Sequence, residues 1–170
     1  MLAHSGIVDR CMICIAMFFA VHSYAADAAE WGQAVNGLRM SISIVPAEGG
    51  PGYIKLVLQN AGNKDLSVGP FHTVGGVCDV FDFVNVFWKD SGGAVSVVRR
   101  TRGGSSRPCS VPLFSGEERS FVKPISFEAL PQRGEFWAEY EPRADEAKAG
   151  CGAVPCWAGK IVSNTLVIPH

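Results

Sequence analysis

The chain lacks a surplus of either charge: among its 170 residues, 15 basic side chains stand against 16 acidic ones. It also lacks an apolar run of the roughly 18 to 20 residues that a membrane-spanning helix needs. Segments with the 3.6-residue periodicity of helices are nearly absent. The balanced charge excludes polycationic roles, such as electrostatic binding of nucleic acid. The lack of a long apolar run argues against a membrane protein built of helices. What is present is 48% apolar residues, enough for one globular domain.

The first 25 residues have the order of a secretory signal. Arg10 precedes an apolar stretch from Cys11 to Val21, which ends at the small-residue pattern Ser23-Tyr24-Ala25. We predict cleavage after Ala25, which leaves a single domain over 26–170, exported to the periplasm or the exterior. A buried helix or a membrane anchor is the alternative, but the apolar stretch is short for a span.

The exported chain would keep four cysteines: Cys78, Cys109, Cys151 and Cys156. An even number in an oxidising compartment favours disulfides, although the sequence leaves three pairings open. Sequential pairing is the simplest. It would close the short loop Gly152-Ala153-Val154-Pro155 with a stabilisation of roughly 2 kcal/mol, and the longer loop between Cys78 and Cys109 with roughly 4 kcal/mol.

A zinc site is the alternative use of these cysteines. Their spacing argues against it, because the one close pair has four intervening residues and the other two cysteines are far apart. Only His72 and His170 remain in the exported chain to add nitrogen ligands. The sequence therefore predicts no metal and no other cofactor.

Alternation of apolar and polar residues predicts β-strands along most of the chain. The turn-forming run Lys89-Asp90-Ser91-Gly92-Gly93 has the spacing of a β-hairpin. A helix over Ala144 to Ala149 is a weak candidate because it has room for only a turn or two. The segments expected as strands are Leu38–Ile44, Ile54–Gln59, Cys78–Trp88, Ala94–Arg99, Ser120–Phe127, Gly134–Tyr140 and Lys160–Ile168.

Short strands at intervals of about ten residues, separated by turn residues, are typical of all-β folds. About seven or eight such strands predict an antiparallel β-sandwich in preference to a barrel or an α/β fold.

Three segments carry a resemblance to known proteins: Glu30–Arg39, Leu58–Gly62 and Trp157–Asn164. They resemble a loosely defined group of bacterial secreted immunoglobulin-like β-sandwich proteins, most of which have no known function. The layout is also similar to the bacterial proteinase-inhibitor sandwich domains. The resemblance covers nearly the whole exported chain and implies an immunoglobulin-like fold. It implies no particular activity, since this fold hosts many unrelated roles.

Motifs for enzymatic catalysis are scarce. The chain has no Gly-x-Ser-x-Gly segment and no glycine-rich phosphate loop that follows a strand and opens a helix. A triad of His72 with Asp79 or Asp82 would come from one local segment, so we favour a surface histidine in a loop between strands. The neighbouring carboxylates Glu117 and Glu118 are interpreted as a solvated turn or strand face.

Five aromatic residues are expected to fill the sandwich core or to pack across strands, with a sugar-binding platform as the alternative. They are Phe81, Phe83, Phe87, Trp88 and Trp137.

Four arginines fall within nine residues, interleaved with Gly103-Gly104-Ser105-Ser106. Guanidinium groups on such a segment suit a phosphate, sulfate or carboxylate partner, whereas a solvated edge and turn is the simpler interpretation. Nucleic acid is not expected here, because the run has no aromatic residue on which bases would stack. The four are Arg99, Arg100, Arg102 and Arg107.

The sequence thus favours an exported, non-catalytic binding or interaction module, whose partner is another protein or an anionic component of the cell envelope. The alternative is a secreted proteinase inhibitor. In that hypothesis the loop between Cys151 and Cys156, stiffened by Pro155, enters a protease cleft with little conformational entropy left to lose.

Overall fold

The computed structural model describes residues 30–47, 50–74, 77–97, 108–124, 133–142, 151 and 156–168. Several predictions from the sequence lie outside these residues: the signal segment, the four clustered arginines, the loop 152–155 and the helix over Ala144 to Ala149. In the described part of the chain, no helix is long and apolar enough to cross a membrane.

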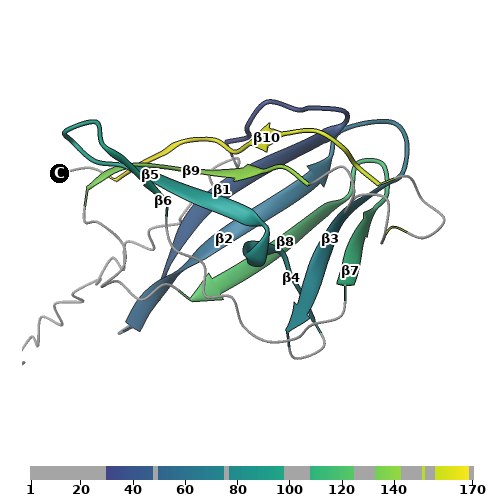
Figure 1. Ribbon diagram of the computed structural model, residues 1–170, viewed down its shortest axis with the longest axis horizontal. Coiled ribbons are helices and arrows are strands. Elements are labelled where there is room, and N and C mark those ends of the chain that lie inside the picture. The colour runs from purple at the N-terminus through teal and green to yellow at the C-terminus, as the bar shows by residue number, and fades with distance from the viewer. Residues whose placement is uncertain are drawn as a thin grey trace, which may run out of the picture.

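The described residues contain eleven strands and one turn of 3-10 helix, η1 (Val80–Asp82), joined by loops. All pairings between the strands are antiparallel (Figure 1). The β2 sheet contains β1 (Leu38–Ala47), β2 (Gly50–Asn60) and β8 (Glu118–Pro124). The β3 sheet contains β4 (Val77–Asp79), β3 (Leu66–Val74) and β7 (Pro108–Leu113). The β5 sheet contains β10 (Ile161–Val162), β9 (Gly134–Tyr140), β5 (Val84–Lys89) and β6 (Val95–Val97), with β11 (Leu166–Ile168) also on β9.

Side chains from all three sheets meet in one apolar core, which confirms the predicted antiparallel sandwich. Tyr140 of β9 is fully buried and joins the layers: its ring centroid lies 5.5 Å from that of Phe71 on β3 and 5.6 Å from that of Trp157. Its hydroxyl donates a hydrogen bond of 3.1 Å to the carbonyl of Gly69. The only polar atom of this large side chain is therefore satisfied inside the core.

The predicted alternation is confirmed where the strands are long. Leu38, Met40 and Ile42 of β1, at every second position of the predicted strand Leu38–Ile44, are buried on one face. The same face of β2 buries Leu56 and Leu58, which lie opposite Ile42 and Met40 in the antiparallel register. Burying apolar side chains on one face of each strand provides the main driving force for packing the sheets together.

Two strands were not predicted, β3 and β7. Gly69-Pro70 interrupts β3 and resembles a turn, but in the structure it forms an irregularity in the pairing with β7, between Val68 and Phe71. A Cβ atom on Gly69 would lie 3.1 Å from the carbonyl oxygen of Cys109, so glycine permits this close approach. β7 carries Pro108 and Pro112, which are tolerated because β7 is an outer strand of its sheet.

The number of strands exceeds the predicted seven or eight because β3 and β7 were not predicted and because two expected strands are each divided. Cys78–Trp88 contains β4, η1 and β5, since the carboxylate of Asp79 caps η1 by accepting a hydrogen bond from the Phe81 amide. Lys160–Ile168 contains β10 and β11, both of which pair with β9. Segments of two or three residues are too short to show alternation of their own.

Both disulfides follow the sequential pairing. Cys78 of β4 is bonded to Cys109 of β7, with Cα atoms 6.0 Å apart, and so joins the two outer strands of the β3 sheet. Cys151 is bonded to Cys156, with Cα atoms 5.4 Å apart. All four thiols are consumed in these bonds, so they do not serve as zinc ligands.

The free edge of β1 is closed by a side chain from the other layer. The Asn164 amide nitrogen donates to the Ile42 carbonyl at 3.1 Å, and its oxygen accepts from the Ile42 amide at 2.7 Å. Ser163, next to it, accepts a hydrogen bond of 2.8 Å from the Ala138 amide of β9. Asn164 thus takes the place of a neighbouring strand and links the β2 sheet to the β5 sheet.

We predict that Asn164→Ala lowers the free energy of unfolding by about 1–3 kcal/mol, because the Ile42 amide and carbonyl lose their partners. Urea denaturation would measure the change. The matched control is Asn63→Ala, at an exposed position, where a change within about 0.5 kcal/mol is expected. Equal stability of the two variants would show that Asn164 does not join the layers.

Candidate functional site

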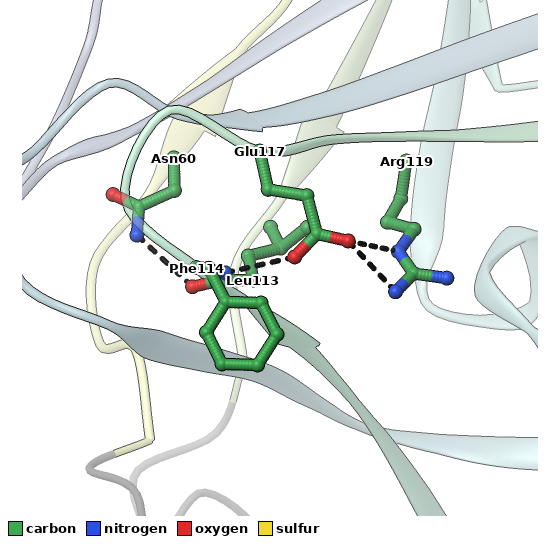
Figure 2. Close-up of polar contacts among 5 residues, drawn as sticks. All are labelled: Asn60, Leu113, Phe114, Glu117 and Arg119. Carbon is green, nitrogen blue, oxygen red and sulfur yellow. Dashed lines mark hydrogen bonds and ion pairs between the residues drawn. The ribbon is translucent and has the colours of Figure 1, made fainter.

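Phe114 is the most exposed aromatic side chain among the described residues, with 62% of its surface accessible. It lies in the loop between β7 and β8; we use the name Phe114 loop for this loop together with the strand residues that flank it, 113–119. An isolated exposed apolar residue is ordinary on a protein surface, but here several hydrogen bonds fix the backbone on both sides of the exposed ring. Figure 2 shows the contacts that Asn60, Glu117 and Arg119 make in this loop.

The loop turns tightly at Phe114. The Glu117 amide donates to the Phe114 carbonyl at 2.9 Å, and the Glu117 carboxylate accepts from the Phe114 amide at 2.9 Å. Gly116 has a φ of +81°, a conformation that favours glycine at this position of a turn. Backbone and side chain of one residue, Glu117, therefore fix both polar backbone groups of Phe114.

Asn60, at the end of β2, supports the loop from below. It is fully buried, and its amide nitrogen donates to the carbonyls of Leu113, at 3.0 Å, and Lys64, at 2.8 Å. Its backbone amide donates to the Glu117 carbonyl, and its own carbonyl accepts from Gly116. Figure 2 shows the Asn60 side chain directed at the Leu113 carbonyl, immediately before Phe114.

A third set of bonds comes from the connection between β2 and β3. The Ser115 hydroxyl donates to the Gly62 carbonyl at 2.7 Å, and its amide donates to the Asp65 carboxylate at 3.1 Å. The amides of Ala61 and Gly62 in turn donate to the Gly37 carbonyl, which ties this connection to the start of β1. The residues on both sides of Phe114 are thus held by the end of β2 and the connection that follows it.

Glu117 is the charged group of the site. The hydrogen bond from the Phe114 amide, and then the Arg119 guanidinium at 2.7 Å, lower the pKa of the Glu117 carboxyl below its usual value. The sequence predicted a solvated turn or strand face for Glu117 and Glu118, and this is confirmed: Glu117 is in the turn and Glu118 begins β8. Glu118 accepts a hydrogen bond of 2.8 Å from Gln59.

This arrangement can present a ring to another molecule at little entropic cost. Binding usually orders side chains and loops, and that ordering reduces affinity. Here the backbone is already ordered, so only the two side-chain torsions of Phe114 remain to be fixed. Large aromatic side chains that fill a pocket are among the residues that dominate protein interfaces.

The structure places His72 differently from the prediction. His72 belongs to β3, opposite Asp79 of β4, and not to a loop between strands. The Asp79 carboxylate caps η1 and lies 3.6 Å from the Lys123 ammonium, in an ion pair. This carboxylate is thus occupied with structural contacts.

The five aromatic residues divide between core and cross-strand packing, as predicted. Phe81 is buried in the core, and Phe83 and Trp88 pack against it. Phe87 of β5 and Trp137 of β9 lie directly opposite one another, with their rings stacked at 5.4 Å and 9°.

The predicted contact residues Arg99, Arg100, Arg102 and Arg107 lie outside the described residues, as do Gly152, Ala153, Val154 and Pro155 of the predicted inhibitory loop. The disulfide that closes this loop, between Cys151 and Cys156, lies within the described residues. The backbone of Cys156 forms a single parallel β-bridge with Ser67 of β3, and the next residue, Trp157, is buried.

Sequence reasoning missed Phe114. The available signal was an aromatic residue beside the turn-forming Ser115-Gly116, but its exposure depends on segments far away in the chain.

Within the described residues, no three His, Cys, Asp or Glu side chains gather as they would around a metal ion. No protein-family model matches the chain, and no curated protein matches it significantly. The resemblance to secreted immunoglobulin-like proteins therefore stays a prediction.

We predict that the Phe114 loop loosens in acid. Because the folded-state pKa of Glu117 is below its unfolded value, its stabilising contribution is present above the unfolded pKa and is lost as pH falls through the folded pKa. The amide resonance of Phe114, followed by NMR, should titrate with a midpoint below the usual pKa of a glutamate side chain. Arg119→Gln should raise that midpoint, whereas Glu118→Gln should not. If Arg119→Gln leaves the midpoint unchanged, the titration does not report the Glu117 carboxyl.

Proposed function

We propose that the protein is an exported, non-catalytic interaction module that binds a protein partner by inserting Phe114 into an apolar pocket. The observation that supports this is the combination of a 62% exposed phenylalanine with a backbone fixed by Glu117, Asn60 and Ser115. A turn needed only to connect β7 and β8 would work equally well with a polar residue at this position.

Export is supported by chemistry as well as by the signal-like segment. The two disulfides are the form that cysteines take in oxidising compartments, and they are uncommon in the reducing cytosol.

An anionic component of the envelope remains the proposed second contact, through the arginines at 99–107. Their contribution would be sensitive to salt, because attraction between exposed charges is screened within about 8 Å at physiological ionic strength. A contact made through Phe114 would depend on salt far less. The salt dependence of binding therefore separates the two contacts.

Phe114→Ser should abolish capture of the partner from an envelope extract. Truncating a central aromatic residue of an interface weakens binding by about 30-fold or more. The matched control is Val167→Ser, which changes a side chain that is 69% exposed on another sheet. Both variants should unfold within about 0.5 kcal/mol of the unmodified protein, since both positions are exposed. If Phe114→Ser and Val167→Ser capture the same proteins as the unmodified chain, Phe114 is not the contact.

Proteinase inhibition is the second candidate, and one observation favours it. The Cys151–Cys156 disulfide closes a short loop, and Cys156 is tied to the core by a hydrogen bond of 2.8 Å from the Trp157 amide to the Ser67 carbonyl. The Trp157 indole also donates to the Val35 carbonyl at 3.0 Å. A loop held in this way would meet the requirement for low mobility in a protease cleft.

A panel of proteinases at micromolar protein concentration distinguishes the candidates. Inhibition that is lost in Pro155→Gly, but kept in Phe114→Ser, would assign the activity to the disulfide loop. An interaction module that acts through Phe114 inhibits none of the panel.

A further inference from the structure

β6 is an outer strand whose far edge pairs with no other described strand. It follows a tight hairpin: the Gly93 amide donates to the Asp90 carbonyl, and the Asp90 amide donates to the Ala94 carbonyl, both at 3.0 Å. Gly93 has a φ of +85°, as expected for the glycine that ends a three-residue hairpin loop. The Asp90 carboxylate also accepts from the Ala94 amide at 2.9 Å. These hydrogen bonds fix the register in which β6 begins to pair with β5.

The register determines which backbone groups point outward. Hydrogen-bonded pairs alternate along an antiparallel ladder, so after Asp90 and Ala94 the next bonded pair is Trp88 with Ser96. The backbone amides and carbonyls of Val95 and Val97 consequently point away from β5, toward the far edge. That edge offers two amide donors and two carbonyl acceptors.

Four other outer strands of the described residues, β1, β7, β8 and β11, carry features that discourage pairing with another chain. β1 is covered by Asn164, and β7 contains Pro108 and Pro112. β8 has charged residues and ends at Pro124, and β11 is followed at once by Pro169. β6, with the sequence Val-Ser-Val, has no charge, no proline and no covering side chain from the described residues.

The side chains of β6 are exposed along its whole length. Val95 is 55% and Val97 is 49% accessible, and both lie opposite residues on the outer face of β5, Lys89 and Phe87. Phe87 stacks on Trp137 in the next strand, so Val97, Phe87 and Trp137 form an apolar row across the β5 sheet. This row ends abruptly at the free edge.

We propose that the β6 edge pairs with β6 of a second copy of this chain, in an antiparallel two-fold dimer. The sequence Val-Ser-Val reads the same in both directions, so centring the pair on Ser96 places Val95 of each copy opposite Val97 of the other. All four outward amides and carbonyls of each edge then find partners. The apolar row of each copy then ends against Val95 of the other copy, and the strand brings no charge into the pair. Two-fold symmetry closes the assembly at two copies.

The dimer should be weak and dependent on concentration, since three residues from each copy make a small interface. Sedimentation velocity from micromolar to near-millimolar protein should show a monomer that converts to dimer. Val95→Pro should abolish the dimer, because proline removes an outward amide while leaving the Trp88 and Ser96 pair intact. Val97→Lys should also abolish it by bringing a charge into the apolar row. The matched control Val167→Lys adds the same charge outside β6 and should still dimerise.

Amide hydrogen exchange locates the contact. At high protein concentration, exchange of the Val95 and Val97 amides should slow several-fold relative to low concentration, while the Ser96 amide, already bonded within the hairpin, should change less. A protein that stays monomeric over the whole range would overturn the proposal. So would a dimer in which the Val95 and Val97 amides exchange equally at both concentrations. Neither result bears on Phe114, which lies in the loop between two other strands.

Discussion

The buried amide of Asn60 is the constraint on which the described surface loop depends. An amide removed from water is costly unless its donors and acceptor are all bonded, and Asn60 meets this requirement only with Leu113, Lys64 and Gly62 in place. Two segments distant in sequence, residues 60–64 and the Phe114 loop, must therefore take one relative position. In that position Glu117 completes the turn by accepting a hydrogen bond from the Phe114 amide, and the Phe114 ring is exposed to solvent. The exposed ring is a consequence of a buried polar network.

Hydrogen bonds of other polar groups also join the sheets to one another. Asn164 substitutes for a strand at the edge of β1, and the Tyr140 hydroxyl finds its acceptor in the carbonyl of Gly69. Each contact links sheets that share the apolar core, and each satisfies groups that would otherwise be buried without partners. The core supplies the driving force for packing, while these bonds specify how the sheets are placed relative to one another.

The strands could be predicted where the local pattern and the tertiary structure agree. β1, β2 and β9 alternate because one face of each is buried, so apolar residues such as Leu38, Leu56 and Phe136 recur at every second position. β3 and β7 could not be predicted in this way, because Gly69-Pro70 and Pro112 are turn signals in isolation. Pairing between the two strands accommodates these residues as an irregularity and an outer-strand position. The residues of β3 and β7 alone do not show that these two strands pair with each other.

The sequence by itself determined the all-β class, the alternating faces of the long strands and the suitability of Cys78, Cys109, Cys151 and Cys156 for disulfides. These are local or compositional properties, readable from neighbouring residues. Only the tertiary structure decided that Cys78 meets Cys109, that Phe114 is exposed on a fixed turn and that the far edge of β6 pairs with no other described strand. Each of these depends on contacts between residues far apart in the chain, and it is the packing of the whole core that selects such contacts.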